Sequence, residues 1–239
     1  MCKFEFDTHC HTIASGHAFS SLQEMVKSAS DKGLKLIGIT DHAPKMPGAS
    51  DIVYFQNLKA VPEKMYGVEV LKGIEANIFN YDGDIDVDDF ILDRLDIVIA
   101  SIHPPCLEIG TKEQNTDATI GAIKNPKVNI IGHPDDSRYL LDYEAIVKSA
   151  KKYGTLLELN NSSLNPNGFR KDSDKNIRQM LKFCKKYNVS IIIGSDAHIS
   201  FDVGNFIYAT KIIDELEFPE ELIVNISVER LKKYLNLGK

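Results

Sequence analysis

Short apolar runs rich in β-branched residues alternate with amphipathic segments from one end of the chain to the other. Such runs, bounded by turn residues, are typical of buried strands. Seven strands are predicted in this way, over Lys3–His11, Lys35–Thr40, Val68–Ile74, Asp96–Ile102, Val128–Gly132, Thr155–Leu159 and Ser190–Ser195. Strands that alternate with helices form parallel sheets, and seven β-then-α units favour an α/β fold whose sheet closes into a barrel.

The segments between the strands carry helix signals. A capping box over Ser21–Glu24 predicts a helix that ends at Gly33. Apolar residues at helical spacing predict four further helices, over Asp142–Tyr153, Asp172–Tyr187, Phe206–Leu216 and the segment from Ser227 to Tyr234. Residues 42–57 are predicted to be a long loop that acts as a lid or covers the barrel end.

Composition narrows the class of protein. The 239 residues are 43% hydrophobic and 26% charged, with a net charge of −6, so we expect one globular domain over residues 1–239. The acidic balance argues against a nucleic-acid polymer as partner, and no apolar run approaches the length of a membrane span. The four cysteines form no C-x-x-C pair, which favours a reducing, cytoplasmic location without disulfides. Whether the chain forms a homo-oligomer is left open.

Polar residues gather where the predicted strands end. All seven histidines lie at or just beyond strand ends, and two acidic residues share that position; the nine are His9, His11, His17, His42, Glu75, His103, His133, Asp196 and His198. In a parallel barrel the carboxyl ends of all strands meet at one rim, so these side chains are expected in one cup.

A cup of imidazoles and carboxylates favours divalent cations, because crowded titratable groups without cations repel one another or lack partners. A catalytic ion takes about three protein ligands, so nine candidate ligands match three ions, with Glu75 and Asp196 as the candidates for bridging. Imidazole and carboxylate donors without cysteine suit zinc first, and also manganese or iron.

Each motif alone has an ordinary structural explanation. A single histidine such as His103 is more often a hydrogen-bonded polar residue than a ligand, and His-x-His occurs by chance. Thr-Asp-His at 40–42 fits a strand-end turn, and the acidic residues of 84–89 lack the frame of a calcium loop. The coincidence of all seven histidines with strand ends is what favours a metal centre.

These motifs resemble the PHP (polymerase and histidinol phosphatase) family over nearly the full chain, and most of all its YcdX-like stand-alone phosphatase branch. They are DTHCHT followed by ASGH, then ITDH, GIEAN, IHP, GHP, LELNNSS and GSDAH. The resemblance implies a distorted seven-stranded (β/α)7 TIM-like barrel. It also implies three metal sites: His9, His11, Glu75 and Asp196; Glu75, His103 and His133; and His17, His42 and His198. Asp7 is expected to orient an imidazole, and Cys10 to pack away from the histidines.

The predicted activity is that of a metal-dependent phosphatase acting on a small phosphomonoester. Water activated by the ions would be the nucleophile, with His9, His11, Glu75 and Asp196 as catalytic residues. Arg170 is the first candidate for phosphate contact, ahead of Lys171 and Arg138. Asn160 and Asn115 are further candidates, to bond either the substrate or the groups that surround the ligands. The alternatives are an amidohydrolase-type C–N hydrolase, a PHP-type nuclease or 3′-phosphoesterase on a short nucleotide, and a non-enzymatic accessory module.

Overall fold

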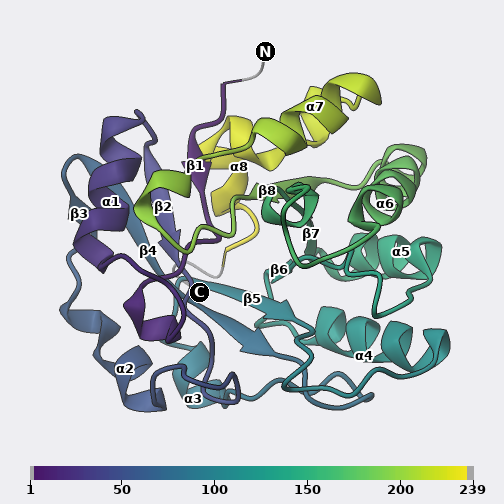
Figure 1. Ribbon diagram of the computed structural model, residues 1–239, viewed down its shortest axis with the longest axis horizontal. Coiled ribbons are helices and arrows are strands. Elements are labelled where there is room, and N and C mark those ends of the chain that lie inside the picture. Colours follow the sequence, from purple (N-terminus) through teal and green to yellow (C-terminus); the bar gives the residue numbers. More distant parts are fainter. Residues whose placement is uncertain (1–2, 236–239) are drawn as a thin grey trace.

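The computed structural model describes residues 3–235, in which seven parallel strands are each followed by a helix (Figure 1). The parallel strands are β1 (Phe6–Asp7), β2 (Leu36–Ile39), β4 (Val68–Asn77), β5 (Ile97–Ser101), β6 (Ile130–Ile131), β7 (Leu156–Asn160) and β8 (Ile191–Gly194). They pair in chain order, and a short β3 (Lys64–Met65) pairs antiparallel with β4. The helices are α1 (Leu22–Asp31), α2 (Ile52–Asn57), α3 (Asp89–Leu92), α4 (Lys112–Lys124), α5 (Tyr143–Tyr153), α6 (Ser173–Tyr187), α7 (Ile207–Glu215) and α8 (Val228–Lys232).

The sheet forms a nearly closed barrel, because β8 lies beside β1 without a regular ladder. Beyond the two strands, the Ala197 carbonyl accepts a hydrogen bond from the His11 amide (2.8 Å). Lower down, the Asn225 side chain bridges the gap: Oδ1 accepts from the Ile193 amide, and Nδ2 donates to the carbonyls of Ile193 and Phe6. The predicted distorted seven-stranded barrel is confirmed.

The barrel interior is apolar at one end and polar at the other. Every parallel strand contributes to the apolar layer, through Phe6, Leu36, Leu71, Ile97, Ile130, Leu156 and Ile192. Because side chains on a strand alternate, the inward positions further along are Glu75 on β4 and Glu158 on β7. The polar layer therefore rests on a packed apolar base at the carboxyl ends of the strands.

The predicted elements are largely present. The capping box on Ser21 begins α1, and α5, α6 and α7 lie within one residue of their predicted bounds. Strand β1 is shorter than predicted, β4 runs on to Asn77, and α8 ends at Lys232. The segment 42–57 contains α2, and α3, α4 and β3 were not predicted. No helix within residues 3–235 has the length and apolar character needed to cross a membrane.

Candidate metal centre

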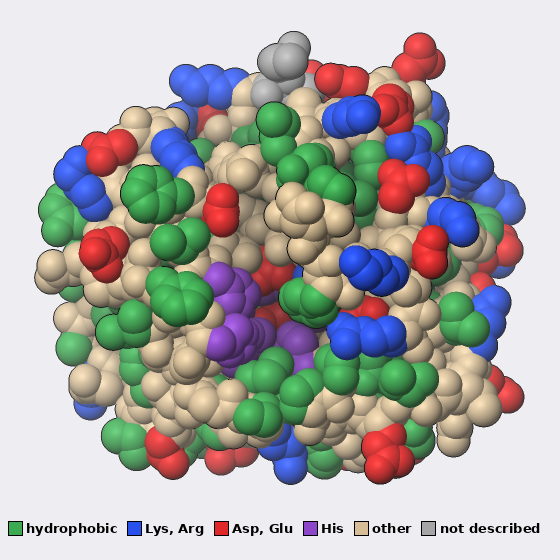
Figure 2. All heavy atoms as spheres, in the orientation of Figure 1, with side chains coloured by type: hydrophobic (Ala, Val, Ile, Leu, Met, Phe, Trp, Pro, Cys, Tyr) green, Lys and Arg blue, Asp and Glu red, His purple; other side chains and the backbone are tan. Residues whose placement is uncertain are grey.

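A cavity of about 490 Å³ opens at the carboxyl ends of the strands. Figure 2 shows histidine side chains at the floor of a hollow at the centre of this face, with acidic side chains behind them and basic side chains along one edge. Its polar lining consists of His17, His42, His103, Asp136, Arg138, Ser162, Arg170, Asp196, His198 and Asp202. The predicted convergence of strand-end residues is thus present.

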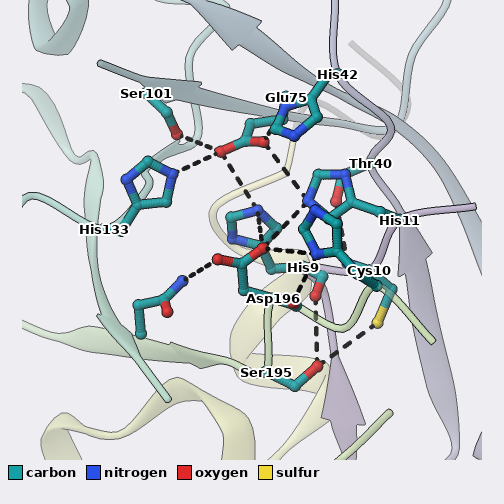
Figure 3. Close-up of polar contacts among 12 residues, drawn as sticks. His9, Cys10, His11, Thr40, His42, Glu75, Ser101, His133, Ser195 and Asp196 are labelled. Carbon is teal, nitrogen blue, oxygen red and sulfur yellow. Dashed lines mark hydrogen bonds and ion pairs between the residues drawn. The ribbon is translucent and has the colours of Figure 1, made fainter. Parts of the chain in front are cut away.

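His9 and His11 follow β1 and point into the polar layer (Figure 3). Nε2 of His9 lies 3.3 Å from Oε1 of Glu75 and 3.7 Å from Oδ1 of Asp196. Nε2 of His11 lies 3.5 Å from Oε2 of Glu75 and 3.4 Å from Oδ1 of Asp196. The two imidazoles therefore stand between the same two carboxylates.

Glu75 lies at the centre of the cluster and is fully buried. Its Oε1 accepts a hydrogen bond from Ser101 (2.6 Å) and lies 2.9 Å from Nε2 of His133 and 3.3 Å from Nε2 of His103. Its Oε2 lies 2.6 Å from Nδ1 of His42, yet neither atom has a hydrogen-bond partner. Imidazoles from three further strand ends therefore face this single carboxylate.

Asp196 is fixed from the other side of the cluster. Its Oδ2 accepts hydrogen bonds from Nη1 of Arg170 (3.0 Å) and Nδ2 of Asn160 (3.3 Å). Asn160 is fully buried and also bonds Glu158 and Ser163, whereas Arg170 lines the cavity. Of the predicted substrate contacts, Arg170 and the lower-ranked Arg138 line the cavity, whereas Asn160 supports the carboxylates from behind.

Several imidazoles are held through the nitrogen that faces away from the cluster. Nδ1 of His9 lies 2.7 Å from Oε1 of Glu158, and Nδ1 of His103 lies 2.8 Å from Oδ1 of Asn77. Nδ1 of His198 lies 3.0 Å from the Asp196 carbonyl oxygen. These contacts leave Nε2 of each ring available as a ligand atom.

Glu158 and Asn77 were missed at the sequence level. Both lie two residues from a polar inward position on the same strand, so strand alternation could have found them. The expectation that Asp7 orients an imidazole is wrong: its carboxylate accepts from the backbone amides of His9, Ser195 and Gly204. Glu158 contacts the His9 ring instead. Cys10 packs among apolar side chains, as predicted.

Five buried ligand-type atoms of the cluster have no hydrogen-bond partner. They are Nε2 of His9, His11 and His103, Nδ1 of His42 and Oε2 of Glu75. A buried polar atom without a partner costs about 1–3 kcal/mol, and here five such atoms face one another. Cations among them would satisfy all five, so the donor set fits divalent ions.

Three groups of side chains each offer ligand atoms within 4.8 Å of one another. They are His9, His11 and Asp196; His42, Glu75 and His103; and His11, His42 and His198. His17 extends the last group, since its ring centroid lies 4.9 Å from those of both His42 and His198. The groups overlap the predicted ligand sets, with His42 standing between two of them.

The charge states of the two carboxylates and of His11 suit cation binding, whereas His9, although burial lowers its pKa, is held well above its usual pKa by Glu158 and Glu75. Although burial raises the pKa of Glu75, the imidazoles of His103 and His42 hold it well below its usual range. Burial likewise raises the pKa of Asp196, but His9 and the adjacent His11 imidazole lower it well below its usual range. Burial and the neighbouring His198 hold the pKa of His11 well below its usual range. Ionised carboxylates and neutral imidazoles are the forms that bind metals.

With this geometry established, the family can be identified. The sequence model of the PHP domain family matches residues 7–191, which is more than half of the chain. The chain belongs to the PHP domain family.

Close relatives of this PHP protein carry the name “Probable phosphatase”. One from Caldanaerobacter subterraneus is 51% identical over 234 residues, covering 98% of this chain and 91% of the relative. Another, from Acetivibrio thermocellus, is 47% identical over 237 residues, covering 99% and 97%.

Solved structures share the fold. Histidinol phosphate phosphatase from Lactococcus lactis, solved with zinc, L-histidinol and phosphate, has a TM-score of 0.60 at 18% identity over 90% of this chain and 94% of that one. A chain of archaeal ribonuclease P with mature tRNA has a TM-score of 0.57 at 16% identity, covering 96% and 87%. At these identities the likeness concerns the fold.

Proposed function

We propose that this PHP protein is a metal-dependent phosphatase that hydrolyses a small phosphomonoester. The observation that carries the proposal is the set of five buried ligand atoms without hydrogen-bond partners, beside a cavity that is also lined by two arginines. The names of relatives that are about half identical over nearly their full length support a phosphatase.

The centre we propose contains three divalent ions, with zinc first and manganese or iron as alternatives. The ligand sets are His9, His11, Glu75 and Asp196; Glu75, His103 and His133; and His17, His42 and His198. Bound ions of this kind lower the pKa of water and neutralise charge on phosphoryl oxygens. The overlap of the clustered side chains with these sets supports the assignment.

Arg170 is the residue we assign to phosphate binding. Its Nη1 donates to Asp196 and to Oγ of Ser163 (3.1 Å), so the side chain is held at the cavity wall. Both bonds use one nitrogen, and the N–H groups of Nε and Nη2 suit two phosphoryl oxygens. Arg170 would thereby orient the phosphoryl group and balance its charge during attack by water.

The cavity dimensions favour a small substrate. A volume of about 490 Å³ is in the range of ordinary small-molecule sites. Phe169 is 69% exposed at the cavity, with the guanidinium carbons of Arg138 and Arg170 at 5.5 and 4.9 Å from its ring centroid. We propose that this exposed ring contacts the organic part of the phosphomonoester.

The test is elemental analysis of the purified protein combined with a substrate panel. The panel contains p-nitrophenyl phosphate, small phosphomonoesters, a short oligonucleotide and cyclic amides. We expect about three metal ions per chain and turnover of phosphomonoesters. Faster turnover of the cyclic amides or the oligonucleotide would favour the alternative activities instead.

Two variants sharpen this test. His9→Ala should lose bound metal and turnover while keeping the circular dichroism spectrum of a folded barrel. Arg170→Ala, assayed with metal in excess because Arg170 also bonds the proposed ligand Asp196, should lower kcat/KM by about 100-fold. Arg178→Ala, a control in an ion-pair network that joins α6 to α7, should leave kcat/KM unchanged. Full turnover in demetallated protein or in His9→Ala would refute the proposal.

A further inference from the structure

Behind His11, on the side away from the cluster, lies a chain of buried hydrogen bonds that the catalytic proposal does not use. Nδ1 of His11 lies 3.0 Å from Oγ of Ser15, and the Ser15 hydroxyl donates to Oδ1 of Asp41 (2.7 Å). Tyr54, on α2, donates its hydroxyl to Oδ2 of Asp41 (2.7 Å). His11, Ser15 and Asp41 are all fully buried.

Asp41 determines which atoms donate and which accept in this series of hydrogen bonds. Besides Ser15 and Tyr54, it accepts from the amide (2.6 Å) and the hydroxyl (2.9 Å) of Thr12, so four donors face its two oxygens. Within residues 3–235 no lysine, arginine or histidine forms an ion pair with it. A carboxylate that faces four donors acts as the acceptor in each of these bonds.

It follows that the Ser15 hydroxyl proton points to Asp41. A hydroxyl has one proton, so Oγ of Ser15 can only accept from its other neighbours. Those neighbours are Nδ1 of His11 and the His42 amide, which donates to the same Oγ at 3.2 Å. The bond with Ser15 therefore requires the proton of a neutral His11 ring on Nδ1, which leaves Nε2 bare.

In the metal-free protein the opposite tautomer, with the proton on Nε2, is also stabilised. Nε2 of His11 lies 3.4 Å from Asp196 and 3.5 Å from Glu75, and both carboxylates would accept a proton from it. A proton on Nε2 would block that atom as a ligand. The bonds behind the ring and the carboxylates in front of it thus compete for one proton.

We propose that Ser15 and Asp41 are positioning residues that set the tautomer of His11, so that Nε2 is free for a metal ion before the ion arrives. Tyr54 completes the acceptor geometry of Asp41 from α2. The inference rests on the proposed metal centre, but its test reads the tautomer without metal and without substrate.

The experiment uses the full chain, demetallated by chelation and labelled with ¹⁵N-histidine. Long-range ¹H–¹⁵N correlation spectra at pH 8 show which ring nitrogen carries the proton, and the His11 signals are assigned by their absence in His11→Asn. In the native sequence His11 should be protonated on Nδ1. In Ser15→Ala its proton should move to Nε2, and zinc affinity should fall by about 10- to 100-fold.

Three further variants separate positioning from loss of structure. Ser15→Thr keeps a hydroxyl and should retain the native tautomer. Ser15→Cys keeps the size but accepts weakly, so it should give a mixture even if Ser15→Ala fails to fold. Ser20→Ala removes a buried hydroxyl of the same region that accepts from the Ser200 amide and contacts no imidazole, and should leave His11 unchanged.

The proposal is overturned if His11 is protonated on Nε2 in the native sequence, or if the tautomer is the same in Ser15→Ala or Ser15→Cys. An equal change in Ser20→Ala would also overturn it, since the effect would then come from general loosening. Absence of phosphatase activity would refute the proposed function and leave this result standing.

Discussion

Glu158→Gln tests whether the residues behind the cluster control metal binding. The carboxylate of Glu158 accepts from three donors: Nδ1 of His9 (2.7 Å), the amide of His133 (2.7 Å) and Nδ2 of Asn160 (3.0 Å). Glutamine has nearly the same shape, but one of its two terminal atoms is a donor. One side of the group must therefore lose its acceptor.

The structure indicates which side loses it. If the amide nitrogen faced His133 and Asn160, two pairs of donors would oppose each other. If it faces His9 instead, only one bond is affected, because Nδ1 of His9 can accept once the ring proton moves to Nε2. That proton then blocks the atom that lies 3.3 Å from Glu75. Each tenfold change in affinity is about 1.4 kcal/mol, and a lost charged hydrogen bond of about 1.5–3 kcal/mol predicts a 10- to 100-fold weaker site.

The assay is a competition titration of zinc against a chromogenic chelator, on demetallated protein whose fold is checked by circular dichroism. Glu24→Gln is the matched control, because it makes the same chemical change in the exposed capping box of α1, where glutamine serves as well. Native affinity in Glu158→Gln, or an equal loss in Glu24→Gln, would refute the reasoning.

Three further predictions concern stability. Gly16→Ala should lower the free energy of unfolding in urea by about 3 kcal/mol, because φ is +80° and the new Cβ would lie 2.0 Å from the Gly48 carbonyl oxygen. Gly33→Ala, where φ is +74° but the space around the new Cβ is open, should lower it by only about 1 kcal/mol. Equal losses in the two variants would contradict this reasoning. Asn225→Ala should lower the free energy of unfolding by about 2–4 kcal/mol, because three backbone groups between β1 and β8 lose the side chain that bonds them. Asn167→Ala, at an exposed position, should leave the free energy of unfolding unchanged. Zinc at 100 times its Kd should raise the free energy of unfolding by about 2.7 kcal/mol per site, and an unchanged melting temperature would argue against metal binding.

The barrel and the cluster could be predicted because both follow from strand alternation and the common direction of parallel strands. Bounds were less predictable where a regular ladder gives way to single contacts. We predict the first strand to run to His11, but its ladder with β2 ends at Asp7. Beyond it, the backbone of Cys10 still bonds Thr40, next to β2, and the His11 amide bonds Ala197, next to β8. The contact with Ala197 joins residues 186 positions apart and has no local pattern.

Helix α4 shows a different limit of sequence patterns. It buries Asn115, Thr116 and Thr119 beside its apolar residues, so hydrophobic spacing along the helix is weak. Asn115 is buried because it bonds the backbone of Gly110 and Leu140, a tertiary arrangement that composition does not encode. A hydrophobic pattern assigns polar residues to the exposed face of a helix. Polar residues that bond backbone groups elsewhere in the fold are therefore assigned to the wrong face, although they belong to the core.

For the same reason, the metal-ligand residues can be predicted from the sequence, but the residues that control their ring nitrogens cannot. Histidines at strand ends can be recognised one by one, because each strand supplies its own. Which nitrogen of a ring is protonated depends on a partner from elsewhere, as with Glu158, which lies 149 positions from His9. The acceptor behind each ring and the carboxylates in front of it act on one proton, so metal affinity depends on the difference between two sets of hydrogen bonds. A chain that keeps every predicted ligand but loses Glu158 or Ser15 should therefore look intact in sequence and bind metal weakly.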